Sequence, residues 1–567
     1  MIQLCVIIGY LVLLLMLGLS ANRFFRGTAT DYMLASHSIG PVLLLMSLFG
    51  TTMTAFALVG STGQAYRAGI GVYGELASAS GIIHSLCFFV IGLPLWSLGR
   101  RHGYITQIQF FRDRLQSDFL GLLLFPILVL LVISYLLVGI VGGGAVVESI
   151  TADAFKSGDS GWFASSGYGV PSWIASAVIC GVVLLYVFFG GMRGTAWANA
   201  FQTAVFMVLG LVTFVTVANA LGARAASEKE MQATKMLAEA RTADSAAEGL
   251  AEAQVITAKA DAQQKEGGSN AFLENLKIAT QSAEPSHLSM EKMPKAVFFS
   301  FLFIPLSVAM FPHVFQHWLT ARSAESFKLP IIMHPVFILI VWAPCVLLGV
   351  WASGENSGVP AALAGMGPEK FNKVLPTLVK LHAGDVLGGL LSAGILAAIM
   401  SSLDSQFLCL GTVFTEDVVR HYAGRERYSD AQVVRLARYF VVGVVVLTYL
   451  LSLLLPGSVF TLGLWSFSGF TGLVPLVFAA IYWRRLTAAG AIASVATTVG
   501  CWTVLFIRAG GKPYTFPEQP LSIVGLVTIP KMLPVVTIFA ASGLVLVVVS
   551  LLTRRPEQET LDKFFSS

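Results

Sequence analysis

Long apolar segments dominate this chain, and their length limits the folds that it can adopt. A helix that crosses a bilayer needs about 20 apolar residues. Hydrophobic residues make up 56% of the 567 residues and charged residues only 12%, a balance that a soluble chain of this size does not show. We therefore expect an all-α polytopic protein of the lipid bilayer with about 13 transmembrane helices, at residues 3–21, 39–65, 72–98, 119–142, 172–190, 196–221, 295–317, 330–352, 385–415, 435–455, 459–483, 487–507 and 531–553.

The arginines predict how these spans are oriented. Cytoplasmic loops of membrane proteins are enriched in Lys and Arg. With the N-terminus outside, thirteen spans place most loop arginines on the inner side, among them Arg23, Arg26, Arg100, Arg101, Arg112, Arg114, Arg193, Arg322, Arg420, Arg484, Arg485, Arg554 and Arg555. The sequence predicts a multi-pass protein of the cell (plasma or inner) membrane with a cytoplasmic C-terminal tail. A net charge of +5, spread over short loops, does not indicate nucleic-acid binding.

One charged segment separates two groups of spans. Residues 223–292 hold 8 Lys/Arg and 11 Asp/Glu among many Ala and Gln residues, which favour helix but offer little apolar surface. The expected domains are therefore residues 1–222 with spans one to six, an extracytoplasmic helical insert at 223–292, and residues 293–567 with spans seven to thirteen. The insert is either a solvated helical segment or a surface that binds a protein partner.

The stretch "ILAAIMSSLDSQ" (395–406) carries hydroxyl groups inside an apolar span. On a helix Ala398, Ser401 and Ser402 share one face, because they are three and four residues apart. Two hydroxyl oxygens and a backbone carbonyl there could form half of a site for a hard cation such as sodium. The alternative is ordinary helix packing, in which each serine bonds back to its own helix.

The second predicted span could supply the other half of such a site. The stretch "SLFGTTMTAFALVGSTGQAYRAGIG" (47–71) has five glycines and a cluster of threonines, which allow a membrane helix to unwind and satisfy its backbone again. Unwound carbonyls of broken membrane helices coordinate ions in transporters. The alternative is a glycine-rich packing helix.

Four motifs identify a family that the chain resembles. They are "GGMRGTAWANAFQ" (190–202), "GYITQIQFFRDRL" (103–115), "FQHWLTARS" (315–323) and "AAIMSSLDSQFLCLGTVFTEDVV" (397–419). Together they resemble the signature segments of the sodium/solute symporter family. The chain departs from the family pattern at Asn199, where the pattern has Asp, and at His317, where it has Arg.

The resemblance implies a LeuT-type fold, with a five-plus-five inverted repeat and broken helices in spans 2 and 7. It also implies that sodium ion is the co-transported ion. The sodium ligands would be backbone oxygens of Gly50, Met53 and Ala398 with the hydroxyls of Ser401 and Ser402. Asp404 would either pair with an arginine or act in ion release, and Tyr66 would contribute to the outer gate.

The same fold implies a solute site at mid-membrane, between the broken spans. Its expected lining is Thr52, Phe56, Ala57, Glu75, Phe311, His313, Gln316 and Trp465. This lining is mostly apolar, which favours a small organic solute such as an amino acid or monocarboxylate over a sugar.

The sequence thus predicts a sodium-coupled symporter that works by alternating access. A proton-coupled or uncoupled transporter of the same fold is one alternative, and a transporter-derived sensor or regulator is another. No cluster of His, Cys or paired carboxylates falls on one predicted face, so the sequence does not favour an enzyme.

Overall fold

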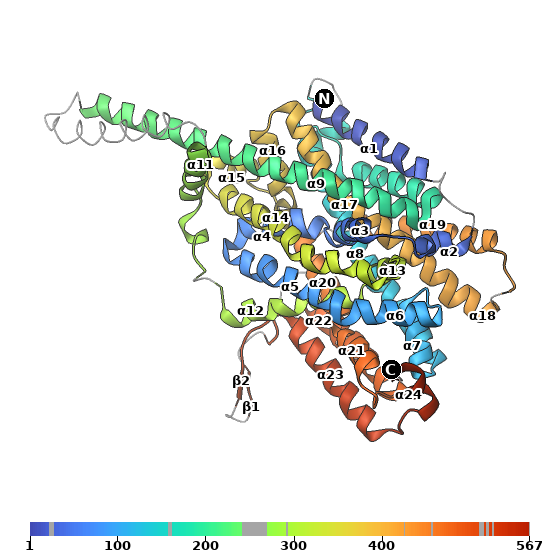
Figure 1. Cartoon of the computed structure of the whole chain (residues 1–567). Helices are drawn as coiled ribbons and strands as arrows, with labels where there is room; N and C mark the ends of the chain where they lie inside the picture. Colours follow the sequence, from blue (N-terminus) through green and yellow to red (C-terminus); the bar gives the residue numbers. More distant parts are fainter. Residues whose placement is uncertain are drawn as a thin grey trace.

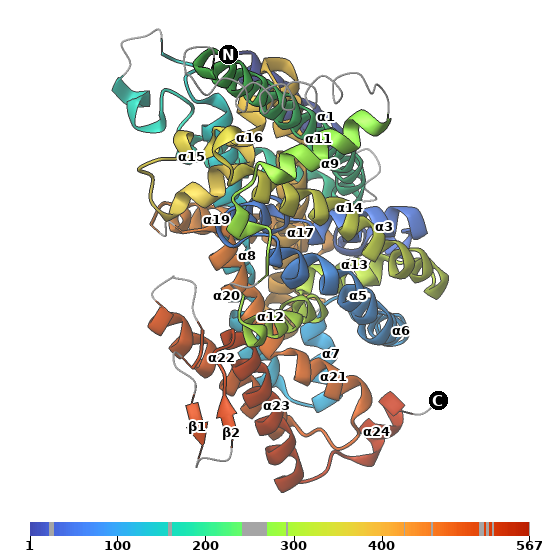
Figure 2. The same ribbon diagram turned by 90° about the vertical axis from the view of Figure 1, so that its left-hand side faces the viewer.

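The computed structural model describes residues 1–21, 28–156, 161–240, 269–290, 293–424, 426–454, 457–509, 515–517, 521–523 and 527–565. Within them the chain forms a bundle of helices and one hairpin, β1 (Leu521–Ile523) antiparallel to β2 (Val527–Ile529). Figures 1 and 2 show the helices gathered around α17 (Asp385–Phe414), with the hairpin at the edge of the bundle. The predicted all-α membrane fold is confirmed.

Ten helices of the described residues are long and apolar enough to cross a membrane, and two bent pairs raise the number to twelve. The helices that form the ten are α1 (Ile2–Ala21), α5, η5 and α6 (Ser78–Cys87, Phe88–Gly92 and Leu93–His102), α8 (Asp118–Thr151), α9 (Ser172–Ala240), α14 (Lys328–Ala352), α17, α19 (Asp430–Leu454), α20 and α21 (Val459–Gly472 and Val474–Tyr482), α22 (Ala488–Ala509) and α23 (Pro534–Leu552). Shorter elements join them: α2 (Ala29–Leu34), η2 (Ala35–His37), η4 (Tyr73–Ala77), α7 (Gln107–Leu115), η6 (Gly161–Ser166), η7 (Pro285–His287), η9 (Ala324–Phe327), η10 (Glu355–Ser357), α15 (Val359–Ala362), η11 (Pro368–Lys373), α16 (Val374–His382), η12 (Thr415–Arg420), α18 (His421–Ala423) and α24 (Gln558–Phe565).

The two bent pairs are the predicted broken spans. In the first, α3 (Pro41–Thr52) meets η3 and α4 (Phe56–Gly60 and Ser61–Ala68) at 57°, and in the second α12 and η8 (Lys295–Ser300 and Phe301–Met310) meet α13 (Pro312–Thr320) at 53°. Side chains replace the lost backbone bonds at the first break. The hydroxyl of Thr52 donates to Leu48 O, and that of Thr54 accepts from the Phe56 N–H. At the second break Pro312 opens α13 and has no N–H to donate.

The predicted count of thirteen spans is not confirmed, and α9 accounts for the difference. The sequence divides it into spans 172–190 and 196–221. In the structure α9 comprises two helices that meet at Gly191, and the count of ten takes them as one helix. Its backbone leaves the helical region only at Gly191, with φ 54° and ψ −158°. The part of α9 before and at this bend spans the bundle. At its start the Ser172 N–H donates to Glu148, and at the opposite end of the bundle Arg193 pairs with Asp31 of α2.

The bundle has two ends that are useful as landmarks. The starts of α1 and α17 lie together, with Gly389 packed against Gln3, and η11 and α16 lie at the same end. This end is called the N-terminal face. The opposite end carries α7, α18 and α24 and is called the C-terminal face. There Arg112 of α7 pairs with the buried Asp417, and Lys563 of α24 pairs with Asp113.

The described parts of the insert are helical. Figure 1 shows α9 continuing beyond the bundle as far as Ala240, and α11 (Ser269–Gln281) lies back against it. Asn275 of α11 donates to Asn219 of α9 at 3.1 Å, and Thr280 accepts from the Trp351 indole of α14 at 3.1 Å. The contacts attach α11 to the bundle. A protein partner for residues 223–292 stays a prediction, because residues 241–268 lie outside the described part.

The reversal at Gly191 generates a test of the fold. A Cβ added there would lie 2.7 Å from the Tyr32 ring in a backbone conformation that L side chains rarely adopt, so Gly191→Ala should lower the free energy of unfolding by ~1–3 kcal/mol. A Cβ at the neighbouring Gly190 would meet only the Gly18 carbonyl, at 3.3 Å, so Gly190→Ala is the matched control. Thermal unfolding of both purified variants measures the difference. Equal melting temperatures would contradict this account of the reversal.

Candidate ion and solute sites

The hydroxyl of Ser401 joins α17 to the broken span. Its Oγ lies 2.8 Å from the Gly50 carbonyl oxygen of α3 and 2.9 Å from the Ala398 carbonyl oxygen of its own helix. Ser402 bonds back to Ile399 O at 2.9 Å. A hydroxyl proton can rotate away and leave the same oxygen as an acceptor, so the group can serve a cation as well as a carbonyl. The structure brings Gly50, Ala398 and Ser401 together.

Glycine at position 50 permits this close approach. A Cβ there would lie 2.6 Å from the Thr203 hydroxyl and 3.3 Å from the Asn199 carbonyl, so a larger residue would push α3 away from α9. Met53 follows the end of α3 with φ −88° and ψ 110°, an extended backbone that is no longer helical. Its carbonyl is therefore released from the helical bonding pattern beside the predicted ligands.

A second cluster of polar groups surrounds Asp404, which is fully buried. Its carboxylate accepts from the Tyr186 hydroxyl at 2.9 Å and from the Ser405 hydroxyl at 3.0 Å. With its amide nitrogen turned toward the carboxylate, Asn199 donates to both oxygens, at 3.0 and 2.9 Å. These donors are all neutral, and the ion pairs of the described residues include no arginine partner for Asp404.

The cluster continues through a histidine to the first broken span. The Ser405 hydroxyl lies 3.1 Å from Nε2 of His317, and Nδ1 of His317 lies 2.9 Å from the Ser47 hydroxyl. All three side chains are buried. A connected path of hydrogen-bonding groups therefore runs from Asp404 of α17 through α13 to α3.

Aromatic rings fill the space between the two breaks. The Phe56 ring lies 5.1 Å from Phe460 and 5.0 Å from Phe467. Phe311 stacks on His313 at 5.2 Å and also contacts Tyr135 at 5.2 Å. We name the set the aromatic cluster: Phe56, Tyr135, Phe311, His313, Phe460, Phe467 and Phe470. Both nitrogens of His313 are buried without a hydrogen-bond partner in the described part of the chain.

Some expected lining residues lie elsewhere. The Trp465 ring packs against Phe506 in a separate apolar cluster with α22 and α23. The Gln316 amide donates to Met33 O at 2.7 Å and to Thr412 at 2.9 Å, away from the rings. Thr52 and Ala57 are buried beside the first break. The side chain of Glu75 lies outside the described residues.

Sequence reasoning missed Tyr135 and Phe460. Tyr135 lies on α8, a long helix that is apolar on all sides, so its sequence does not indicate which face points into the bundle. The signal that could have found it is that it is the one tyrosine of residues 118–151. Buried tyrosines usually find a partner for their hydroxyl, which marks such a residue for inspection.

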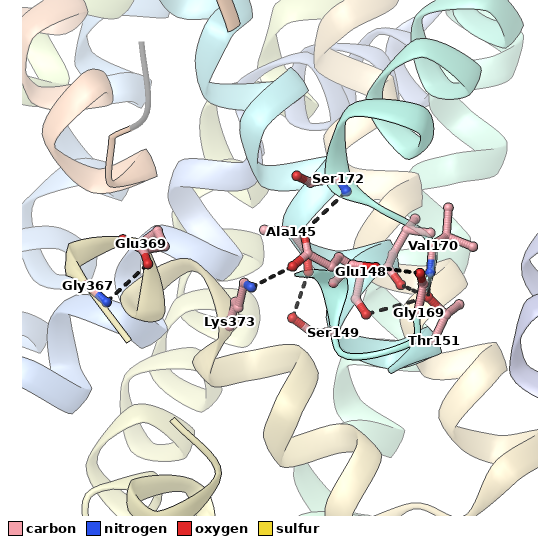
Figure 3. Close-up of polar contacts among 12 residues, drawn as sticks. Ala145, Glu148, Ser149, Thr151, Gly169, Val170, Ser172, Gly367, Glu369 and Lys373 are labelled. Atoms are coloured by element: carbon pink, nitrogen blue, oxygen red, sulfur yellow. Dashed lines mark hydrogen bonds and ion pairs between the residues drawn. The ribbon is translucent and has the colours of Figure 1, made fainter. Parts of the chain in front are cut away.

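At the N-terminal face, η11 covers the end of the first broken span. Phe371 contacts the ring of Tyr66 at 6.3 Å, and Asn372 donates to Gly457 O at 3.0 Å. Figure 3 shows the neighbouring attachment: Lys373 of η11 reaches Glu148 of α8 at 2.7 Å. Glu148 also accepts from the Ser172 N–H at 3.2 Å. The ion pair is largely buried and ties η11 to two membrane helices.

Comparison with known proteins gives a consistent result. The family model described as "Sodium:solute symporter family" matches residues 32–498. The sodium/proline symporter of Haemophilus influenzae is 23% identical over 98% of this chain and 95% of its own length. The high-affinity proline transporter PutP of Bacillus subtilis is 24% identical over 94% of this chain and 95% of its own length.

A solved structure supports the fold. The substrate-bound, outward-open state of a Na+-coupled sialic acid symporter superposes with a TM-score of 0.62 at 16% sequence identity, covering 98% of this chain and 99% of that one. Both chains share the LeuT-type arrangement that the two broken spans predict. Because the family model covers most of the sequence, this chain belongs to the sodium:solute symporter family.

Proposed function

We propose that this sodium-coupled symporter binds its ion at the contact between α3 and α17. The observation that carries the proposal is the position of the Ser401 hydroxyl, 2.8 Å from Gly50 O and 2.9 Å from Ala398 O across the break. Sodium prefers several neutral oxygens, which unwound carbonyls and serine hydroxyls provide. The proposed ligands are Gly50 O, Met53 O, Ala398 O, Ser401 Oγ and Ser402 Oγ.

The solute site lies in the aromatic cluster beside the sodium site. Its proposed lining is Thr52, Phe56, Ala57, Tyr135, Phe311 and His313. Apolar rings with a few polar groups suit a compact organic solute. Two relatives are named as carriers of proline, and we propose a small amino acid or monocarboxylate as the solute class. His313 offers an unpartnered imidazole to its polar end.

The first broken span couples sodium binding to solute binding, because it contributes to both proposed sites. Sodium between α3 and α17 holds the broken span in place, and that span also lines the solute site. Each ligand therefore raises the affinity for the other by the same factor. The ion pair between Lys373 and Glu148 closes the N-terminal face in this scheme, and Tyr66 beneath η11 forms part of that gate. With the N-terminal face outside, the arginine-rich C-terminal face is cytoplasmic.

Asp404 has a separate role in this proposal, in ion release. Removing an ionised carboxylate from water is costly unless it is paired, and only neutral groups donate to it here. We assign to it the binding of a cation, or a proton, that leaves the sodium site toward the C-terminal face. The path through Ser405 and His317 favours a proton, so proton coupling is the second candidate function.

Substitution of the two serines tests the sodium site. Ser401→Ala/Ser402→Ala should abolish the thermal stabilisation by sodium and lower sodium-driven uptake by about tenfold or more, because two of five ligand oxygens are lost. Ser392→Ala is the matched control, since Ser392 is also buried on α17 but bonds only to its own helix, at Gly388 O. Potassium and choline serve as reference ions. If sodium still stabilises the double variant, the ion does not bind at this site.

Substitution of Asp404 tests the ion-release role and separates sodium from proton coupling. Asp404→Asn should lower sodium-driven uptake by about tenfold, because charge-assisted hydrogen bonds weaken. It should also abolish any uptake driven by a pH gradient without sodium. Asp385→Asn, at the exposed first turn of the same helix, should leave both unchanged. Unchanged uptake in Asp404→Asn reconstituted in vesicles would contradict the role.

The ion pair at η11 generates a third test. Lys373→Gln should shift the protein toward the state that is open at the N-terminal face. If the ion pair stabilises the closed state by about 1 kcal/mol, its loss should raise the apparent sodium affinity by about fivefold. Lys156→Gln is the control, because Lys156 pairs with Asp153 in an exposed position. Sodium titration of thermal stability measures both. An affinity equal to that of the unaltered protein would show that the pair does not hold this face closed.

A further inference from the structure

A basic cavity lies at the C-terminal face, away from the transport site. It has a volume of about 380 Å³ and lies between the end of α7, the start of α22 and the segment that joins α23 to α24. Arg114, Arg554 and Arg555 line it, and Glu557 is the acidic residue of its lining. Positive charge therefore exceeds negative charge in the cavity wall.

Arg114 is fully buried, and part of its guanidinium has no acceptor. Nε donates to Ala480 O at 3.0 Å and Nη2 to Trp483 O at 3.2 Å, at the end of α21. Nη1 has no hydrogen-bond partner among the described residues, although the guanidinium carbon lies 4.9 Å from the centroid of the Phe565 ring. Burial lowers the pKa of Arg114 to about 10, so the group remains charged at neutral pH. A buried, charged donor without an acceptor is destabilising unless a ligand supplies one.

The start of α22 lies against the cavity and presents the positive end of its helix dipole there. The helix is 22 residues long, and Thr487 and Ala488 at its start line the cavity. Thr487 accepts from the N–H of Gly490 with its hydroxyl at 3.1 Å and from the N–H of Ala491 with its carbonyl at 3.0 Å. Thr487 thus satisfies two of the first N–H groups, and the N–H groups of Ala488 and Ala489, which have no acceptor within the helix, are the ones left for a ligand at the positive end of the dipole.

Arg554 and Arg555 complete the wall from the other side. Both are exposed, and neither forms an ion pair within the described part of the chain. They follow α23, whose last residue, Leu552, is 82% exposed. The cavity therefore lies at the end of a helix that is long and apolar enough to cross a membrane, where lipid headgroups are expected.

From these observations we propose that the cavity binds a phosphate group. Arginine forks and helix N-termini are the two arrangements that recognise phosphate best, and both face this cavity. An anionic phospholipid headgroup or phosphate in solution could supply the group. The inference does not depend on the proposed transport site, which lies in the interior of the bundle.

The test uses the full chain in nanodiscs. In one arm phosphatidylglycerol is added to phosphatidylcholine nanodiscs, and in the other inorganic phosphate is added to nanodiscs of phosphatidylcholine alone. We expect one of these probes to raise the melting temperature and Arg554→Gln/Arg555→Gln to weaken that probe's binding by about tenfold or more. Arg100→Gln/Arg101→Gln is the matched control, because these adjacent, exposed arginines lie on the same face at the end of α6.

Every outcome bears on the proposal. Stabilisation by phosphatidylglycerol alone identifies a lipid headgroup as the source, and stabilisation by inorganic phosphate identifies the soluble anion. Either result supports the site only if the stabilisation is lost in the Arg554/Arg555 variant and kept in the Arg100/Arg101 control. No stabilisation by either probe, or an equal effect in both double variants, would overturn the site. Both variants change exposed side chains, so each should remain folded.

Discussion

The hydrogen bond from Ser401 to the Gly50 carbonyl joins the two elements on which the transport site depends. A bilayer offers no water to the carbonyls that a broken helix releases, so the protein must satisfy them itself. Here α17 and the threonines around the break perform that task. The oxygens that the fold must satisfy are therefore the oxygens of the proposed sodium site, where ion binding would replace one set of partners by another.

The position of the buried charge distinguishes this chain from the family pattern that it resembles. That pattern has Asp at position 199, on α9, where this chain has Asn. The structure places the Asn199 amide about 3 Å from both oxygens of Asp404 on α17. One carboxylate, that of Asp404, thus lies at the contact of α9 and α17, on the helix that holds the proposed sodium ligands.

The sequence predicted those parts of the fold that follow from hydropathy and from glycine, proline and threonine. It identified both breaks, because they depend on residues that either unwind a helix or satisfy its backbone locally. It identified Ala398 and Ser401 because helical spacing puts them on one face. It did not predict that the Trp465 ring packs against Phe506 or that Tyr135 lies among the rings between the breaks, since a span that is apolar on all sides gives no sign of which ring faces the interior. The predicted division of α9 near residue 190 agrees with the bend at Gly191, although the total of thirteen spans is not confirmed.

The helix α7 connects the basic cavity to the second break. Arg114 at its end lines the cavity. Gln107 at its start donates to the carbonyl of Met310, the last residue of η8 at the second break, at 3.3 Å. Nine residues of one rigid helix thus contact both places. If phosphate binds in the cavity as proposed, a ligand that fixes Arg114 would also restrain the Met310 carbonyl through α7. By reciprocity, it would then favour the transport state that keeps α7 in this position.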